Sequence, residues 1–340
     1  MIQYGDIRDL DGHTLEPVDL IVGGSPCQNL SIAGNRQGLE GSESGLFLEM
    51  IRIIREMRER TNGVYPRYAL FENVPGLFTC NDGRDFSVVL GEYARLIEPS
   101  APDVPVPQMG WKKAGVLLVG DGQIAYRTHQ AQLWGLPQYR ERIALIVSFG
   151  DQSAAEILFE RKDMPENLES KSTQKDENAR NSGKSIESTD TVKQYVFDSQ
   201  PYHDYREMSD ICQSISAQYG TGGNNMPFVV TDDGMFHVRK LTPLEATRLQ
   251  GYPDEWLDIP GASDSKKFKA LGNSLCLPFW EHLAYRFAQY GNVRTIGSLF
   301  DGIGGFPLVF KRAGCKTLWV SEIEPFCQRV VAYHTERGDL

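Results

Sequence analysis

A single cysteine stands where the chain could expose a nucleophile. Cys27 belongs to the stretch GSPCQ at 24–28, which directly follows the apolar run 18–22. A partly ionised thiol is a strong nucleophile, and the carboxyl edge of a sheet is where α/β proteins bind their ligands. A buried structural cysteine is the alternative. The position of Cys27 alone predicts a reactive site but does not identify the reaction.

A carboxylate and two guanidinium groups also stand beside apolar runs. Glu72 directly follows the run 68–71 and could donate a proton to a ring nitrogen if a dry pocket raises its pKa. Gln138, Arg140 and Arg142 alternate into a further run, so a strand there would put all three on one face. Two guanidinium groups on one face suit recognition of a phosphate or a carbonyl oxygen. A salt-bridged glutamate and a solvated edge strand are the alternatives.

A glycine-rich turn near the end of the chain could approach a nucleotide or a nucleoside. Residues 300–305 read FDGIGG and stand between a strand pattern and a helix pattern. Glu322 lies about twenty residues further on, at the end of the next strand pattern, where a carboxylate can bind ribose hydroxyls. The glycine spacing differs from the G-x-G-x-x-G fingerprint, which argues against NAD or FAD. Turns of this kind also occur as purely structural devices.

The elements that must position these residues follow an α/β pattern. Short buried-strand patterns alternate with amphipathic helix patterns, and two strands joined by a helix predict a parallel β-α-β unit. Gly120 and Gly122 predict a hairpin at the sheet edge. The predicted strands are 18–22, 68–71, 116–119, 142–147, 295–300 and 317–320, and the predicted helices are 45–60, 306–313 and 324–334.

Length, charge and cysteine content limit the class of protein to which this sequence can belong. The 340 residues predict one large domain or two unequal ones. With 35 Lys and Arg against 45 Asp and Glu, the net charge of -10 argues against bulk coating of nucleic acid and leaves room only for a local basic cleft. The chain shows no secretory signal and no membrane-spanning run. Its six cysteines form no CxxC pair, so disulfides and structural zinc are not expected.

Together these stretches resemble the motifs of the cytosine-C5 DNA methyltransferases. The motifs that carry the resemblance are 300–305, Glu322, 26–28, 72–74, 138–142, 239–253 and 272–274. They cover nearly the whole chain apart from 150–210. The resemblance implies a doubly wound, mixed but mostly parallel Rossmann-like sheet, as in S-adenosylmethionine-dependent methyltransferases, with a second, smaller target-recognition domain.

The resemblance also implies catalytic roles for individual residues. Cys27 would attack C6 of a cytosine turned out of the duplex, and Glu72 would hold or protonate N3. Arg142 would contact the cytosine carbonyl oxygen while Arg140 supports the pocket, and both arginines would line the local basic cleft. The implied DNA contacts are Gln28, Ser31 and Gln138.

S-adenosylmethionine is the cofactor that the resemblance implies. Phe300 would stack on its adenine, Glu322 would bind its ribose, and the glycine-rich turn would approach its methionine part. The residues that match cofactor-lining positions are Phe300, Asp301, Gly302, Ile303, Gly304, Gly305, Glu322, Ile323, Asp6, Ile7, Leu46 and Asn273.

The motif order differs from the usual order in this family, in which the glycine-rich turn opens the chain. Here Gly5-Asp6-Ile7 stands first and the turn stands last. The sequence therefore predicts a circular permutant whose two ends lie close together. The predicted catalytic domain combines 1–149 and 262–340. The predicted target-recognition domain is 150–261, in which 160–193 is too polar to bury a core and is expected to be a mobile loop.

The resulting prediction is a sequence-specific DNA (cytosine-5-)-methyltransferase of bacterial or phage restriction-modification. Its expected partner is double-stranded DNA, it is expected to be a cytoplasmic monomer, and neither a metal nor a membrane is expected. Two alternatives stay open. One is a catalytically inactive DNA-binding relic, suggested only by the unusual motif order, and the other is a cytosine-5 RNA methyltransferase, which would share the chemistry.

Overall fold

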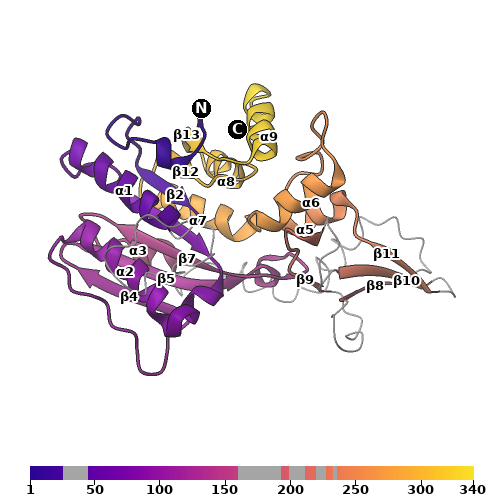
Figure 1. Ribbon diagram of the computed structural model, residues 1–340, viewed down its shortest axis with the longest axis horizontal. Coiled ribbons are helices and arrows are strands. Elements are labelled where there is room, and N and C mark those ends of the chain that lie inside the picture. Colours follow the sequence, from indigo (N-terminus) through magenta and orange to yellow (C-terminus); the bar gives the residue numbers. More distant parts are fainter. Residues whose placement is uncertain (26–44, 160–192, 199–210, 220–226, 233–235) are drawn as a thin grey trace.

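A mixed eight-stranded sheet forms the centre of the molecule (Figure 1). The computed structural model describes residues 1–25, 45–159, 193–198, 211–219, 227–232 and 236–340. The strand order in the sheet is β1-β13-β12-β2-β3-β7-β5-β4. The strands of this sheet are β1 (Ile2–Tyr4), β2 (Leu20–Gly23), β3 (Tyr68–Asn73), β4 (Ala114–Val119), β5 (Gly122–Gln130), β7 (Glu141–Ser148), β12 (Thr295–Leu299) and β13 (Lys316–Ser321).

The first five strands in this order are parallel. β1, β13, β12, β2 and β3 run in one direction, whereas β7, β5 and β4 alternate in direction. β4 and β5 form an edge hairpin through Gly120, whose φ is +53°, so the predicted hairpin is confirmed. The prediction of an α/β protein with a mixed, mostly parallel sheet is also confirmed.

Helices cover both faces of the sheet. The helices of the described residues are α1 (Gly45–Arg60), α2 (Arg84–Ile97), α3 (Ala154–Leu158), α5 (Pro243–Gln250), α6 (Asp264–Asn273), α7 (Leu277–Gln289), α8 (Gly305–Arg312) and α9 (Pro325–Glu336), of which α5 and α6 lie to one side of the main sheet (Figure 1). Because successive strand residues point to opposite faces, Ile21, Phe71 and Leu145 share a buried cluster with α1 and α2, whereas Val22 and Leu70 share one with α7 and α8. Among the described residues, none of these helices combines the length and the apolar character that a bilayer span requires.

Smaller strands lie to one side of the main sheet (Figure 1). They are β8 (Lys193–Asp198), β10 (Pro227–Asp232) and β11 (Phe236–Lys240), which pair antiparallel, and β6 (Gln138–Tyr139) and β9 (Cys212–Gln213), which pair parallel. Ile215, Tyr219 and Val229 belong to the same buried cluster as α7 and α8, so the described part of this region shares its core with the main sheet. The predicted mobile loop, except for its last residue, lies outside the described residues.

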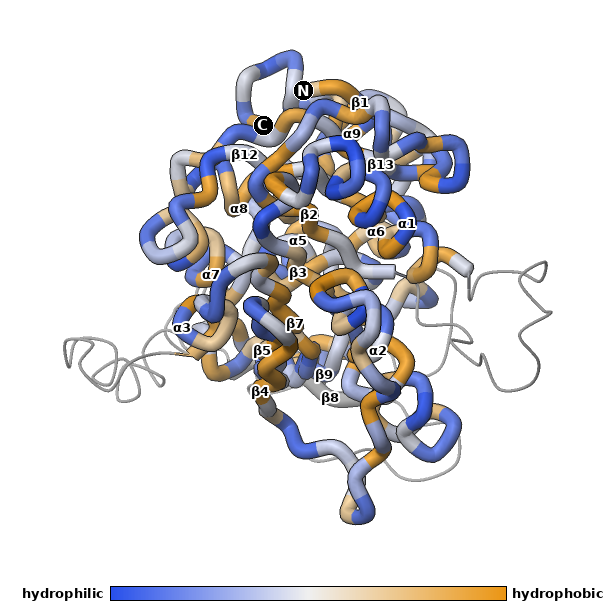
Figure 2. The backbone as a smooth tube through the Cα atoms, turned by 90° about the vertical axis from the view of Figure 1, so that its left-hand side faces the viewer, coloured by the Kyte–Doolittle hydropathy of each residue, from blue (hydrophilic) through white to orange (hydrophobic). Residues whose placement is uncertain are grey.

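The two ends of the chain lie side by side, as predicted. β1 pairs in parallel with β13, and Tyr4 stands opposite Ser321. Gln3 Nε2 donates a hydrogen bond to Gln328 O of α9 at 3.0 Å. Figures 1 and 2 both show the N and C labels close together, and Figure 2 shows hydrophobic stretches along β7, β5 and β4. The beginning and the end of the sequence therefore build adjacent strands of one sheet.

A buried carboxylate fastens the amino ends of the central strands. Asp19, which is 8% exposed, accepts hydrogen bonds from Arg294 N at 2.8 Å and Thr295 N at 3.0 Å, at the start of β12. Its other oxygen accepts from Arg67 Nη2 at 3.0 Å, directly before β3. Burial by itself would raise the pKa of Asp19, but these donors outweigh burial and lower the pKa.

Replacing Asp19 with Asn should lower the free energy of unfolding by about 2–4 kcal/mol at pH 7, because buried donors lose a charged acceptor. Since the folded pKa lies below the unfolded one, the stabilisation is present above about pH 4 and is lost as the pH falls through the folded pKa. Urea unfolding at several pH values between 7 and 3 measures the difference. The exposed control Asp9→Asn should change the free energy by less than about 0.5 kcal/mol. A gap between wild type and Asp19→Asn that stays constant in acid would contradict this role.

Candidate active site at the carboxyl edge of the sheet

The carboxyl ends of the five parallel strands bring predicted residues to one edge of the sheet. The turn 300–305, called the glycine loop from here on, follows β12, and Glu322 follows β13. Asp6 follows β1, and Glu72 lies near the end of β3. From β12 the sheet continues through β13 and β1 on one side and through β2 and β3 on the other. This is a switch point of the kind at which α/β sheets bind ligands.

Glu72 and Arg142 form a partly buried ion pair at this edge. Because β7 runs antiparallel to β3, its first residues reach the place where β3 ends, and Arg142 Nε lies 3.0 Å from Glu72 Oε1. The side chains of Arg142 and Glu72 are 15% and 16% exposed. Burial raises the pKa of Glu72, and the charges of Arg142 and Arg140 offset this only in part. The pair therefore presents a carboxyl group that can hold a proton beside a fixed cation.

The loop after β2 approaches this carboxylate closely. A side chain at Gly24 would place its Cβ 2.5 Å from Glu72 Oε2, which only glycine avoids. Asn73, which is buried, donates from Nδ2 to Ser25 O at 3.3 Å. Asn73 is absent from the predicted site residues, and its place at the same strand end as Glu72 is the signal that identifies it. The predicted residues Cys27, Gln28 and Ser31 follow directly in sequence and lie outside the described residues.

Arg140 is a buried clamp between distant segments. It is 3% exposed, and its guanidinium group donates to Ile215 O at 3.0 Å, Gly272 O at 3.1 Å and Ser274 O at 2.6 Å. Burial lowers its pKa to about 10, so the group stays charged at neutral pH. Arg140 therefore supports the site from within, and the prediction that it lines an open basic cleft is wrong.

The side-chain amide of Gln138 is likewise hydrogen-bonded inside the protein. Its side chain is fully buried, with Nε2 donating to Leu249 O at 2.9 Å and Oε1 accepting from Ile215 N at 3.1 Å. Both ends of the amide are thus taken by backbone groups. The prediction that Gln138 contacts DNA is therefore wrong, because other segments cover the strand face on which it lies.

The glycine loop leaves β12 with an unusual backbone. Gly302 and Gly304 have φ values of +60° and +80°, and Phe300, at +54°, adopts the same region in spite of its side chain. Gly302 N donates to Glu322 Oε2 at 2.7 Å, which joins the loop to the end of β13. Within the described part of the chain, a Cβ at Gly302 would meet no atom within 4 Å. The loop therefore offers open backbone at this position, beside the carboxylate that follows β13.

Asp301 brings a buried carboxylate into the glycine loop. The residue is 6% exposed, and one carboxylate oxygen accepts from Ser298 Oγ. The other oxygen, Oδ2, has no hydrogen-bond partner in the part of the chain that the structure describes. Burial raises the pKa of Asp301 to about 7, although the bond from Ser298 acts in the opposite direction. Since an unpaired buried acceptor is costly, this oxygen indicates a ligand that donates a hydrogen bond or carries positive charge.

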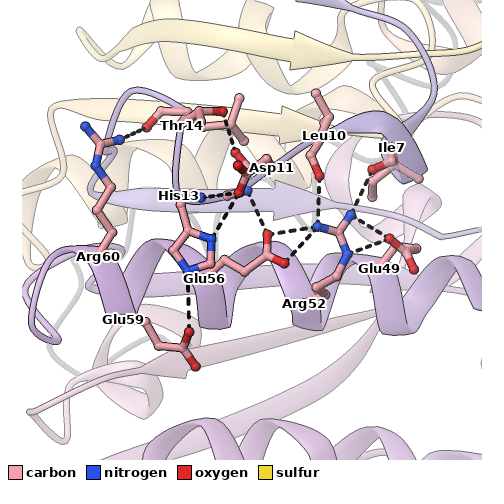
Figure 3. A network of polar contacts seen from close by, with 12 residues as sticks. Ile7, Leu10, Asp11, His13, Thr14, Glu49, Arg52, Glu56, Glu59 and Arg60 are labelled. Atoms are coloured by element: carbon pink, nitrogen blue, oxygen red, sulfur yellow. Dashed lines mark hydrogen bonds and ion pairs between the residues drawn. The ribbon is translucent and has the colours of Figure 1, made fainter.

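Helix α1 fixes the turn that follows β1 (Figure 3). Arg52 donates to Ile7 O at 3.2 Å and to Leu10 O at 2.8 Å. Asp6 caps the same turn with its side chain. Because α1 also carries Leu46, these bonds hold Asp6, Ile7 and Leu46 in a fixed relation to one another.

Three side chains in Figure 3 are close enough to share a cation. Asp11, His13 and Glu56 bring one ligand atom each to within 4.8 Å of the others. They are also bonded within the protein, since His13 Nδ1 lies 3.0 Å from Asp11 Oδ1 and Glu56 accepts from Arg52. The absence of a metal stays a prediction.

The remaining predicted cofactor residues differ in exposure. Ile323 is 63% exposed and Asn273 is exposed as well, so both side chains are accessible. Ile303 is 1% exposed and packs in the core beneath the glycine loop. A Cβ at Gly305 would lie 2.5 Å from Tyr252 OH. Ile303 and Gly305 therefore shape the loop by packing.

Several proteins with similar sequences are named methyltransferases. The chain is 29% identical over 304 residues to the Type II methyltransferase M1.ScrFI of Lactococcus lactis subsp. cremoris, across 84% of this chain and 66% of that protein. It is 27% identical over 292 residues to the Type II methyltransferase M.Bsp6I of Bacillus sp. (strain RFL6), across 82% and 81%. Over 288 residues it is 27% identical to the Type II methyltransferase M.SsoII of Shigella sonnei, across 81% and 65%. The chain thus spans about two thirds of the length of the first and third of these relatives.

A solved structure has a similar fold. The crystal structure of the S. pombe Dnmt2 methyltransferase matches with a TM-score of 0.52 and 14% sequence identity, over 84% of each chain. This likeness concerns the fold alone.

The sequence also matches a protein family over most of its length. The family is described as C-5 cytosine-specific DNA methylase, and the matched residues are 2–96 and 122–289. The glycine loop and Glu322 lie beyond these ranges, at the same sheet edge as the matched Glu72. The chain belongs to the C-5 cytosine-specific DNA methylase family.

Proposed function

We propose that this protein is a sequence-specific DNA (cytosine-5-)-methyltransferase of a bacterial or phage restriction-modification system. The observation that carries the proposal is the partly buried Glu72–Arg142 ion pair at the same sheet edge as the glycine loop and Glu322. Methyl transfer requires the target nucleobase and the methyl donor to be held side by side, and this edge of the sheet offers polar groups that can bind each of them. Family membership and the names of the relatives support the same assignment.

The proposed reaction is methyl transfer to C5 of a cytosine. The Cys27 thiolate attacks C6, and the Glu72 carboxyl group holds or protonates N3, which stabilises the charge that attack would otherwise leave on the ring. Arg142, fixed by Glu72, donates to the cytosine carbonyl oxygen. After the methyl group has been transferred, loss of the C5 proton and elimination of Cys27 restore the aromatic ring.

The residues of the glycine loop fit a positively charged nucleoside cofactor. S-adenosylmethionine is the methyl donor when bound. The Oδ2 atom of Asp301, which has no hydrogen-bond partner among the described residues, suits its positive charge. Glu322 binds its ribose, and Phe300 stacks on its adenine. The further residues that hold it are Gly302, Ile303, Gly304, Gly305, Ile323, Asp6, Ile7, Leu46 and Asn273.

Double-stranded DNA is the proposed substrate, and 150–261 is the proposed target-recognition region. A separate three-stranded sheet within that range supports this division. Arg140 binds Ile215 O and so attaches the region to the catalytic edge. Gln28 and Ser31 are proposed to contact DNA, and the enzyme is proposed to act as a cytoplasmic monomer.

We also propose that the motif order of the family is circularly permuted in this chain. β12 and β13 come last in sequence but stand between β1 and β2 in the sheet. The chain ends lie side by side, and the family match stops at residue 289, before the glycine loop. A permutation that places the chain ends in a surface connection accounts for these observations. The order of the strands in the sheet does not depend on which connection between strands holds the two ends.

The purified protein should transfer labelled methyl groups from S-adenosylmethionine to cytosine C5 in duplex DNA. Cys27→Ser should abolish transfer, and Glu72→Gln should lower kcat by about 100-fold or more, because a glutamine amide cannot transfer a proton to N3. The exposed control Glu336→Gln should leave kcat unchanged. Mass spectrometry of digested DNA measures 5-methylcytosine. Transfer to RNA alone would favour an RNA methyltransferase, and no transfer to varied duplexes would contradict the proposal and favour a relic.

Binding of S-adenosylmethionine should strengthen as the pH rises from 6 to 8. With a pKa of about 7, Asp301 is mostly protonated at pH 6 and mostly ionised at pH 8, and the ionised form attracts a positive charge. Calorimetric titration of the DNA-free protein measures Kd. Asp301→Asn should bind more weakly at pH 8 and respond less to pH. Identical pH profiles in wild type and Asp301→Asn would show that Asp301 takes no part in binding.

A further inference from the structure

A tryptophan supports the glycine loop from within the protein. Trp256, between α5 and α6, is 2% exposed, and its indole Nε1 donates to Ile303 O at 2.8 Å. Ile303 stands between Gly302 and Gly304, whose φ values are both positive. The indole bond therefore fixes the middle of a loop whose neighbouring residues have few intrinsic restraints on their backbone.

Helix α9 holds Trp256 in turn. The His334 ring stacks on the indole, with ring centroids 3.7 Å apart and 5° between the planes. His334 Nε2 lies 2.8 Å from Trp256 O, and His334 Nδ1 lies 2.8 Å from Asp339 Oδ2. The tryptophan is thus held at its ring and at its backbone. Trp256, His334 and Asp339 are called the tryptophan brace from here on.

The segment after α9 also packs on the glycine loop directly. A Cβ at Gly304 would lie 2.9 Å from Leu340 Cδ1, so glycine at this position lets the leucine approach. Leu340 N donates to His334 O at 3.3 Å, which ties this contact to the same helix. The brace and Leu340 therefore support the loop at two neighbouring residues, Ile303 and Gly304.

We propose that Trp256 is a positioning residue for cofactor binding, which acts through Ile303 O and is held in place by His334. The inference rests on the proposed function, in which S-adenosylmethionine is the ligand of the glycine loop. A loop that is fixed before binding loses less conformational entropy when the ligand arrives. The brace should therefore strengthen cofactor binding and leave the chemical step unchanged, because it stabilises the ground state and the transition state equally. Trp256 lies beyond the motif 239–253 and carries no role in the sequence motifs.

Trp256→Phe is the direct test, because it keeps an aromatic ring and removes the indole N–H. Calorimetric titration of the DNA-free variant with S-adenosylmethionine should give a Kd about five- to ten-fold above that of wild type. Amide hydrogen exchange of residues 300–305 in the cofactor-free protein should be faster in the variant. At saturating cofactor, kcat should equal that of wild type.

Trp111→Phe is the matched control. Trp111 Nε1 donates to Gly83 O at 2.8 Å, and its ring packs edge-on against Phe86 at 5.0 Å. This variant loses the same type of bond outside the glycine loop, so its Kd for S-adenosylmethionine should equal that of wild type. His334→Phe keeps a stacked ring and removes both imidazole hydrogen bonds, and it should raise Kd in the same direction as Trp256→Phe.

The outcomes separate this inference from the proposed function. If wild type binds S-adenosylmethionine and both Trp256→Phe and His334→Phe bind it equally well, the brace serves stability alone and the inference is overturned. If Trp256→Phe does not fold, His334→Phe decides by the same titration. If wild type does not bind S-adenosylmethionine at all, the proposed function fails as well. A raised Kd in Trp256→Phe with an unchanged Trp111→Phe supports the inference.

Discussion

The parallel pairing of β12 with β13 on one side and with β2 on the other is the constraint on which the site depends. It directs the strand ends that carry Asp6, Glu72 and Glu322 to a single edge, although the first two residues come from the first part of the sequence and Glu322 comes from its last part. Asp19 fastens the opposite, amino edge of the central strands. Loops can therefore build the site at the carboxyl edge, because the register of the central strands is fixed at their amino ends.

Charge at this edge is separated into two sides. On the side of β3 and β7, Arg142 pairs with Glu72, and the charge of Arg140 also acts on that carboxylate. Arg140 itself is bonded mainly to neutral carbonyl groups, which do not cancel its charge. On the side of β12 and β13, Asp301 and Glu322 provide acidic groups. Under the proposed function the first side suits the electron-rich edge of a cytosine, and the second suits a cationic methyl donor. An overall charge of -10 is compatible with such a site, because only the local balance acts on the ligands.

Much of the fold could be predicted from periodicity alone. The helix predicted at 45–60 coincides with α1, and the strands predicted at 68–71 and 317–320 lie within β3 and β13. Sequence patterns did not predict α2 and α7. α2 contains Val88, Val89 and Gly91, residue types with low helix propensity, and its helical state depends on packing against the sheet. Such elements are decided by tertiary contacts that a local pattern does not contain.

Local sequence patterns are enough to identify the residues that end strands and the glycines that permit a left-handed backbone, and therefore the residues that share one sheet edge. The segments that cover each of these residues are set by the folded chain. Alternation places Gln138 and Arg140 on one strand face, but the segments around Ile215 and Gly272 bury that face and turn both side chains into internal clamps. The burial of the Asp301 carboxylate and the bond from Trp256 to Ile303 are likewise not evident from the sequence. Periodicity reports the direction of a side chain, whereas its hydrogen bonds depend on segments far away in the chain.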